Sequence, residues 1–344
     1  RILHPDLSNF IIAAGSAEPV FGEKEKKNME KIAIIGCGLI GQGWAAVFAQ
    51  AGFEVAMYDT SAEAAKRALK AMETRIADLA EFDLIKPSDA PQVLQRITVA
   101  DGLEEALDDA IYIQENGPEN IDIKIKITLA LDAIATKDVP IGSSTSGISA
   151  SRYCKDIEGR HRCLVVHPIN PPHLHPAVEI VPTPWTDQSI VSKVNDVMMK
   201  CQRETIVLSE EIDGFVVNRL QGALLEEAFK LVGSGIVSAE DLDKAICDGL
   251  GLRWSIMGPM QTIHLNAPGG VIDYVARYGE MYRGFGIGSY DDVDWASIAT
   301  EKIATELSQR TPVAKIPEAQ IVRDRKLMAL LRHKKQARVE TSKQ

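Results

Sequence analysis

Short apolar runs and stretches with helical spacing alternate along the first two hundred residues of the chain. Runs typical of buried parallel strands lie at 32–35, 53–58, 111–115, 139–143, 163–166, 177–181 and 205–208. The spacing of apolar residues predicts helices at 42–50, 61–79, 103–107, 121–135 and 189–201. Such alternation is typical of an α/β protein with a doubly wound sheet and helices on both of its faces.

The strand pattern ends near Asp213, and only helical signals follow it. An amphipathic helix is predicted over 215–232, and the capping-box sequence at 238–241 opens another. We therefore predict an α/β domain over 29–213, followed by a smaller all-α domain over 214–325.

Two terminal segments lie outside these predicted domains. Residues 1–28 are poorly patterned, and Met29 comes just before the first strand. We interpret 1–28 as a poorly ordered extension, with a short secretory signal peptide as the alternative. The tail 326–344 is basic and polar, so a frayed helix is expected there.

The overall composition argues against several classes of protein. A chain of 344 residues exceeds the size at which one core usually stops growing, which favours two domains. A formal net charge of −10 argues against a nucleic-acid partner, and no apolar run is long enough to span a membrane. The five cysteines show no metal or redox spacing, so we expect reduced thiols and a cytoplasmic location. His173 and His175 lack a matching set of ligands, so no metal site is expected.

The best-defined motif joins the first strand to the first helix. Its sequence is Gly36-Cys37-Gly38-Leu39-Ile40-Gly41. The glycines allow a tight turn, close approach of the backbone to a pyrophosphate, and close packing of the helix on the strand. The helix N-terminus stabilises the phosphate charge. Because the motif follows a strand and opens a helix, it favours a Rossmann-type dinucleotide site over a glycine turn without a ligand.

Asp59, at the end of the second strand, indicates which dinucleotide binds. A carboxylate in this place accepts hydrogen bonds from the adenosine ribose and repels a 2′-phosphate. The next residues are Thr60 and Ser61 rather than arginine, which favours NAD over NADP. The alternative is that Asp59 only stabilises the N-terminus of the following helix.

His167 and Glu179 form a candidate catalytic pair. Removal of hydride from an alcohol needs a base that also takes the hydroxyl proton, and a carboxylate can hold a histidine in the required tautomer. His167 ends one predicted strand, and Glu179 lies in the next. Taken alone, His167 fits a structural histidine equally well. An unpaired buried carboxylate is costly, so Glu179 within an apolar run strengthens the pair.

Two further polar residues are candidates for contacts with a substrate oxygen. Ser146 ends the run Ser143-Ser-Thr-Ser146 after a strand, although such runs are often simple turns. Asn218 begins the first helix of the second domain, which would bring it to a cleft between domains. The alternative for Asn218 is an asparagine on a helix surface.

Together, these motifs resemble those of the 3-hydroxyacyl-CoA dehydrogenase family, and most of all its lambda-crystallin, or L-gulonate 3-dehydrogenase, branch. The resemblance runs from about residue 31 to about residue 278. It is carried by 36–41, 143–146, 167–172, 213–219, 249–253, 258–259 and 264–267.

The resemblance implies roles for individual residues. His167 is implied as the general base with Glu179 as its partner, and Ser146 and Asn218 as donors to the 3-oxygen of the substrate. Asn170 is implied as a further substrate contact. The cofactor contacts are implied to be Gly36, Gly38, Leu39, Ile40, Gly41 and Asp59, with Glu119 and Lys124 near the nicotinamide ribose. The family fold implies a helical domain that forms a homodimer.

The nature of the substrate depends on Arg253. An arginine pairs bidentately with a free carboxylate, which a thioester lacks, so Arg253 favours a small free 3-hydroxy acid such as L-gulonate or L-3-hydroxybutyrate. A surface arginine is the alternative interpretation. Acyl-CoA and L-carnitine remain alternative substrates, the latter with Trp254, Tyr274 and Tyr278 around its ammonium group. An NAD-binding structural protein of the crystallin kind is the alternative of another class.

Overall fold

The computed structural model describes residues 29–255, 257–268, 270–285 and 312–341. The chain divides into two compact units, with the boundary along the chain between Glu211 and Ile212, and each is described by itself. The expected extension 1–28 lies outside the described residues.

The first unit is built on an eight-stranded sheet with the order β3-β2-β1-β4-β5-β6-β7-β8. Its strands are β1 (Lys31–Ile35), β2 (Glu54–Tyr58), β3 (Ile97–Val99), β4 (Ala110–Glu115), β5 (Ile141–Ser143), β6 (Cys163–Pro168), β7 (Ala177–Pro182) and β8 (Glu204–Val207). Neighbouring strands are parallel except β6 and β7, which are antiparallel. The order reverses at β1, as in doubly wound sheets.

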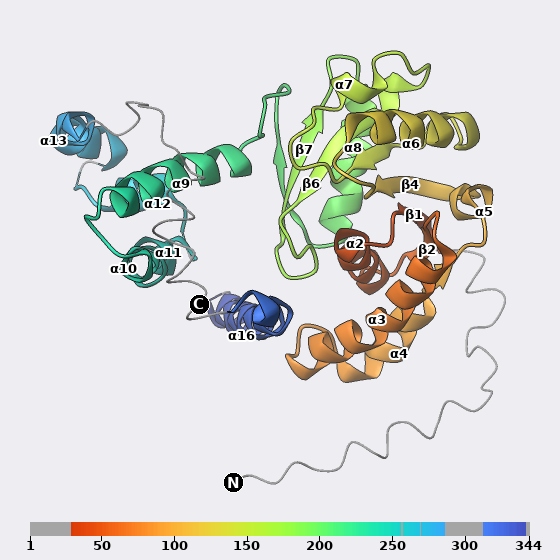
Figure 1. The fold of residues 1–344 in the computed structure, drawn as a ribbon, viewed down its shortest axis with the longest axis horizontal. Coiled ribbons are helices and arrows are strands. Elements are labelled where there is room, and N and C mark those ends of the chain that lie inside the picture. Colours follow the sequence, from red (N-terminus) through yellow and green to blue (C-terminus); the bar gives the residue numbers. More distant parts are fainter. Residues whose placement is uncertain (1–28, 256, 269, 286–311, 342–344) are drawn as a thin grey trace, which may run out of the picture. The chain divides into compact units, whose positions relative to one another are not determined.

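Helices connect and flank these strands (Figure 1). They are α2 (Leu39–Gln50), α3 (Ala62–Glu81), α4 (Ala90–Gln95), α5 (Leu103–Leu107), α6 (Ile121–Ile134), α7 (Ser151–Cys154) and α8 (Gln188–Lys200). Helix α3 begins where the hydroxyl of Ser61 accepts a hydrogen bond from the Ala64 amide at 3.2 Å. The predicted α/β architecture is therefore confirmed, while the short elements β3 and α4 were not predicted.

One part of the core of this unit lies between the sheet and helix α2, and buried apolar residues of α3, α6 and α8 extend it. The four apolar residues of β1 after Lys31 are buried, as expected for a central parallel strand. Along α2, the rings of Trp44 and Phe48 are fully buried and stack with their centroids 5.2 Å apart. The carboxyl ends of β1 and β4 are thereby fixed relative to the start of α2, and these ends position the site.

The second unit contains only helices among its described residues, as predicted. They are α9 (Val217–Gly233), α10 (Ala239–Lys244), a π-helical segment (Ala245–Leu250), α11 (Gly251–Trp254), α12 (Pro259–Leu265), α13 (Gly270–Gly284), a 3₁₀ turn (Val313–Lys315) and α16 (Ile316–Thr341). Position 326, where a frayed tail was expected to begin, lies inside α16. Within the described ranges, no helix is long and apolar enough to cross a membrane.

Candidate active site

A cavity of about 490 Å³ lies at the carboxyl ends of β1, β2 and β4. Its lining includes Gly36, Gly38 and Asp59 of the predicted dinucleotide site, together with Asn116 and Gly117. A Cβ on Gly41 would lie 2.0 Å from the carbonyl oxygen of Gly36, so only glycine lets α2 start this close to the turn. The segment Gly36–Gly41, called the cradle below, therefore holds the N-terminus of α2 next to the turn, an arrangement that suits a pyrophosphate.

The carboxylate of Asp59 joins two parts of this cradle. Its Oδ2 accepts a hydrogen bond from the Cys37 amide and its Oδ1 one from the Ser61 amide, both at 2.9 Å. A carboxylate has about four lone-pair sites, so acceptor capacity remains for ribose hydroxyls. Asp59 therefore supports the start of α3, as the structural interpretation holds, and also lines the cavity that fits NAD.

His167 and Glu179 face each other across the antiparallel pair β6 and β7. The strand register places His167 opposite Glu179, and His167 Nδ1 lies 2.7 Å from Glu179 Oε2. The two residues are 6% and 0% exposed. Since a carboxylate accepts, Nδ1 carries the proton of the neutral imidazole in this contact. The structure thus brings His167 and Glu179, the predicted catalytic pair, into contact.

Glu119 holds the loop that carries Ser146. Its Oε1 accepts hydrogen bonds from the Thr145 hydroxyl at 2.7 Å, the Gly147 amide at 2.9 Å and the Ser146 amide at 3.2 Å. This loop begins at the carboxyl end of β5, next to β6 and its His167. The contacts of Glu119 fix the backbone of the loop.

Lys124 is buried rather than lining the cavity. Its side chain is 1% exposed, and its Nζ lies 2.9 Å from Glu115 Oε2. The Ser143 hydroxyl donates to the same carboxylate oxygen at 2.5 Å, and the Gly117 amide donates to Oε1 at 2.5 Å. Glu115 therefore ties together α6, β5 and the turn after β4.

Asn116 and the other residues of that turn also line the cavity, although they were not predicted as site residues. The side-chain Nδ2 of Asn116 donates to the Gln114 carbonyl at 2.8 Å, and its Oδ1 accepts from the Ser144 hydroxyl at 2.7 Å. The signal available was the Asn-Gly-Pro sequence at 116–118, directly after an apolar strand.

The remaining candidates are Asn170, Asn218 and Arg253. Asn170 is exposed and precedes a cis peptide bond to Pro171. Asn218 and Arg253 belong to the second unit, where Asn218 is half-buried near the start of α9 and Arg253 is exposed on α11. The hydrogen bond to Tyr282 is the main cause that raises the pKa of Tyr274. The positive charge of the nearby Arg253 offsets part of this rise.

His173 and His175 lie in the loop between β6 and β7, and no cluster that could hold a metal occurs among the described residues. Burial, with help from the charge of Arg75, lowers the pKa of His173 from 6.5 to about 3. His173 is therefore neutral in the folded protein at neutral pH.

The low pKa of His173 makes folding stability depend on pH. Between about pH 6.5 and pH 3 the unfolded chain binds a proton at this residue that the folded chain does not, so stability is full above pH 6.5 and falls below it. From pH 7 to pH 5 we expect wild type to lose about 2 kcal/mol more unfolding free energy than His173→Gln. Urea unfolding of both proteins at the two pH values measures the difference. Equal losses of unfolding free energy in the two proteins would contradict the lowered pKa of His173.

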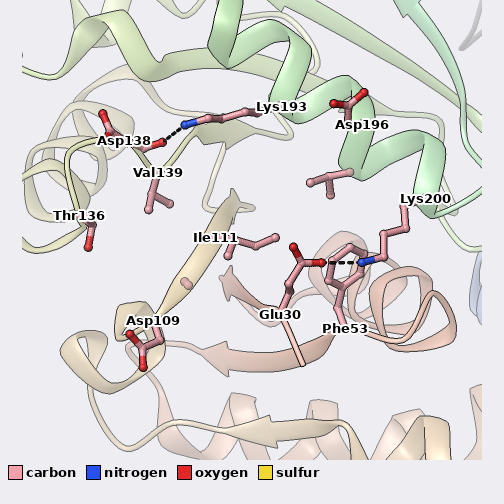
Figure 2. Close-up of a pocket in the computed structure, with 12 residues that line it drawn as sticks. Glu30, Phe53, Asp109, Ile111, Thr136, Asp138, Val139, Lys193, Asp196 and Lys200 are labelled. Atoms are coloured by element: carbon pink, nitrogen blue, oxygen red, sulfur yellow. Dashed lines mark hydrogen bonds and ion pairs between the residues drawn. The ribbon is translucent and has the colours of Figure 1, made fainter. Parts of the chain in front are cut away.

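A second cavity, of about 600 Å³, lies at the amino ends of the strands, and Figure 2 shows residues that line it. Glu30 and Ala110, at the amino ends of β1 and β4, line it. Two lysines of α8 at its rim are engaged: Lys200 pairs with Glu30 at 2.5 Å, and Lys193 donates to the Asp138 carbonyl at 3.2 Å. This cavity is thus separate from the dinucleotide cradle.

The fold and the cradle define a nicotinamide-dependent dehydrogenase. Residues 31–212 match the family of the 3-hydroxyacyl-CoA dehydrogenase NAD binding domain, and residues 214–298 match the 3-hydroxyacyl-CoA dehydrogenase C-terminal domain. The chain belongs to the 3-hydroxyacyl-CoA dehydrogenase family, as predicted, and its cofactor is NAD.

Several relatives show how the chain is placed within this family. It is 40% identical to the lambda-crystallin homolog of Rattus norvegicus, over 72% of this chain and 78% of that protein. It is 34% identical to L-carnitine dehydrogenase of Oceanobacillus iheyensis, over 82% of this chain and 88% of that protein. It resembles the solved structure of FHMPC 5-dehydrogenase, an NAD+ dependent dismutase, with a TM-score of 0.76 and 28% identity, covering 88% and 98% of the two chains. The predicted resemblance to lambda-crystallin is confirmed.

Proposed function

We propose that this protein oxidises the 3-hydroxyl group of a small free 3-hydroxy acid. The observation that carries the proposal is the buried contact of 2.7 Å between His167 Nδ1 and Glu179 Oε2. Such a pair fixes the imidazole tautomer and stabilises the imidazolium that forms when the base takes a proton. Bound NAD supplies the hydride acceptor.

In this mechanism His167 Nε2 takes the hydroxyl proton as hydride leaves carbon 3 of the substrate. Glu179 keeps the imidazole oriented and offsets its positive charge. Ser146 and Asn218 donate hydrogen bonds to the substrate oxygen, and such donors each contribute about 3 kcal/mol to transition-state stabilisation. Asn170 contacts the substrate from the loop after β6.

For the cofactor, we propose that the cradle from Gly36 to Gly41 binds the pyrophosphate and that Asp59 binds the adenosine ribose. Glu119 lies near the nicotinamide ribose and acts by holding the loop that carries Ser146 in place. Lys124 supports the same side from its buried pair with Glu115. The domain roles follow from this: 29–213 binds NAD and 214–325 contributes to the substrate site.

We also propose that the protein is a cytoplasmic homodimer. Helix α13 exposes large apolar side chains, among them Ile272 at 82%, Val275 at 52% and Met281 at 47%. A second copy of the chain would cover such a surface. All five cysteines, which lie in described residues, are free thiols, in keeping with a reducing compartment.

For the substrate, we propose that Arg253 binds its carboxylate. Replacing Arg253 with Met should raise the KM for a free 3-hydroxy acid about tenfold or more, since charge-assisted hydrogen bonds are lost. The kcat should change less. Arg283→Met, on α13 of the same unit, is the matched control and should leave KM near the wild-type value. Steady-state kinetics at saturating NAD measure both, and an unchanged KM in the Arg253 variant would remove the carboxylate anchor.

The proposed function is tested by offering the purified protein four substrates separately and following NADH by absorbance. These are L-gulonate, L-3-hydroxybutyrate, L-carnitine and L-3-hydroxybutyryl-CoA. We expect turnover of a free acid without the thioester. Preference for L-carnitine would favour Trp254, Tyr274 and Tyr278 as the site of its ammonium group. Preference for the thioester would exclude Arg253 as the residue that binds a substrate carboxylate. Binding of NAD without turnover of any substrate would favour the structural alternative.

A further inference from the structure

A chain of side chains runs from the cofactor cradle to helix α3. The side-chain Nε2 of Gln42 on α2 donates to the Cys37 carbonyl inside the glycine motif at 3.0 Å. The Gln42 side-chain oxygen in turn lies 3.5 Å from Arg75 Nη2. Arg75 is half-buried on α3, so its guanidinium is held over the protein rather than extended into solvent.

The second terminal nitrogen of the Arg75 guanidinium contacts the loop that joins His167 to Glu179, the two residues called the dyad below. This loop, 169–176, connects β6 with its His167 to β7 with its Glu179. Arg75 Nη1 lies 2.9 Å from His173 Nε2 and 3.1 Å from Nδ1. A neutral imidazole has one acceptor nitrogen, so one of these contacts is a hydrogen bond, donated by the guanidinium.

Two more contacts fix the same loop. A Cβ at Gly43 on α2 would lie 2.7 Å from Pro172 Cδ, so glycine allows the helix to touch the loop directly. From the other side, Arg203 donates to the carbonyls of Pro172 at 3.2 Å and His175 at 3.4 Å. The loop is thus clamped between α2, α3 and the start of β8. Arg75 is the member of this clamp that also reaches the cradle, through Gln42.

We propose that Arg75 is a positioning residue that couples occupation of the NAD cradle to the order of loop 169–176. A pyrophosphate at the glycine motif fixes the Cys37 backbone, Gln42 and Arg75 carry that restraint to His173, and the loop holds both dyad strands at their ends. Coupling of two sites needs such a continuous set of packed and hydrogen-bonded groups. The inference rests on the proposed function, since it takes the cradle as the cofactor site and the dyad as the reacting pair.

Hydrogen exchange of the loop, measured with and without saturating NADH, tests the proposal. The amides of Leu174 and His175, each bonded to the Pro171 carbonyl at 3.0 and 3.1 Å, report the order of the loop. In wild type we expect NADH to slow their exchange about fivefold or more, the lower range of coupling between sites. In Arg75→Met this dependence on NADH should fall below about twofold although NADH still binds. Fluorescence of bound NADH sets saturation for each protein.

Two further variants separate coupling from folding. Gln42→Leu breaks the same chain at its other link and should also remove the dependence on NADH, even where Arg75→Met does not fold. Arg67→Met changes an exposed arginine of α3 and should behave as wild type. If Arg75→Met and Gln42→Leu speed exchange equally with and without NADH, these residues are only structural and the proposal is overturned. An absence of NADH-dependent slowing in wild type overturns it as well. Failure of wild type to bind NADH is a distinct result, which rejects the proposed function and the inference together.

Discussion

Replacing His167 with alanine is expected to lower kcat for the 3-hydroxy acid about 10³-fold, because a positioned base contributes about 10²- to 10⁴-fold. The affinity for NAD should stay within about twofold, since His167 does not line the dinucleotide cavity. Steady-state kinetics give kcat, and NADH fluorescence gives the affinity. Turnover that survives in the variant would exclude His167 as the base.

Two variants test whether the loss belongs to the dyad. Glu179→Gln keeps a side chain of the same shape but removes the charge that offsets the imidazolium and no longer fixes the tautomer, so a loss of about 10²- to 10⁴-fold is expected. His161→Ala changes a histidine in the 3₁₀ turn Arg160–Arg162, outside both cavities, and should leave kcat unchanged. Wild-type kcat in Glu179→Gln would show that the contact at 2.7 Å does not serve catalysis.

Replacing Lys124 with methionine is expected to lower the free energy of unfolding by about 3 to 5 kcal/mol. The change leaves Glu115, which is 2% exposed, as a buried carboxylate without its cation. Urea unfolding without NAD measures this loss. Lys126→Met, two residues further along α6 and exposed, is the matched control and should change stability by less than about 0.5 kcal/mol.

A double variant shows whether the cost arises from the unpaired charge. Glu115→Gln together with Lys124→Met removes both charges and should recover most of the stability, because a neutral pair has no buried ion left to compensate. Equal stability of Lys124→Met and Lys126→Met would contradict the importance of the pair. No recovery in the double variant would assign the cost to lost packing.

The cradle and the order of elements could be predicted because their signals are local. The motif from Gly36 to Gly41 follows an apolar run of the right length, and Asp59 ends the next one. Strand β3, by contrast, is three residues long, and the six residues of α4 carry a proline at their start, so neither has enough positions for a period to show.

The contacts within the site could be predicted only in part. His167 and Glu179 were both nominated, but their contact depends on the antiparallel register of β6 and β7, which the loop 169–176 sets. Lys124 has the pattern of a charged helix residue, and its burial follows from Glu115, which reaches it from the end of β4. Long-range pairings of this kind leave no periodic trace in a single sequence.

The link through Arg75 shows the same limitation. Arg75 and His173 are 98 positions apart, and nothing in the spacing of either indicates the other. On helix α3 an arginine among alanines and glutamates is the ordinary composition of an exposed face. Only the folded chain places it between the cradle and the dyad loop.

In the proposed reaction, hydride passes from carbon 3 of a free hydroxy acid to NAD, with His167 as the base. The most direct test uses the substrate that turns over, deuterated at carbon 3, and examines the reduced cofactor by mass spectrometry. We predict that one deuterium per turnover appears in the NADH formed, and that His167→Ala forms neither labelled nor unlabelled NADH at a comparable rate. Reduced cofactor without deuterium, or label transfer at the wild-type rate in the His167 variant, would contradict it.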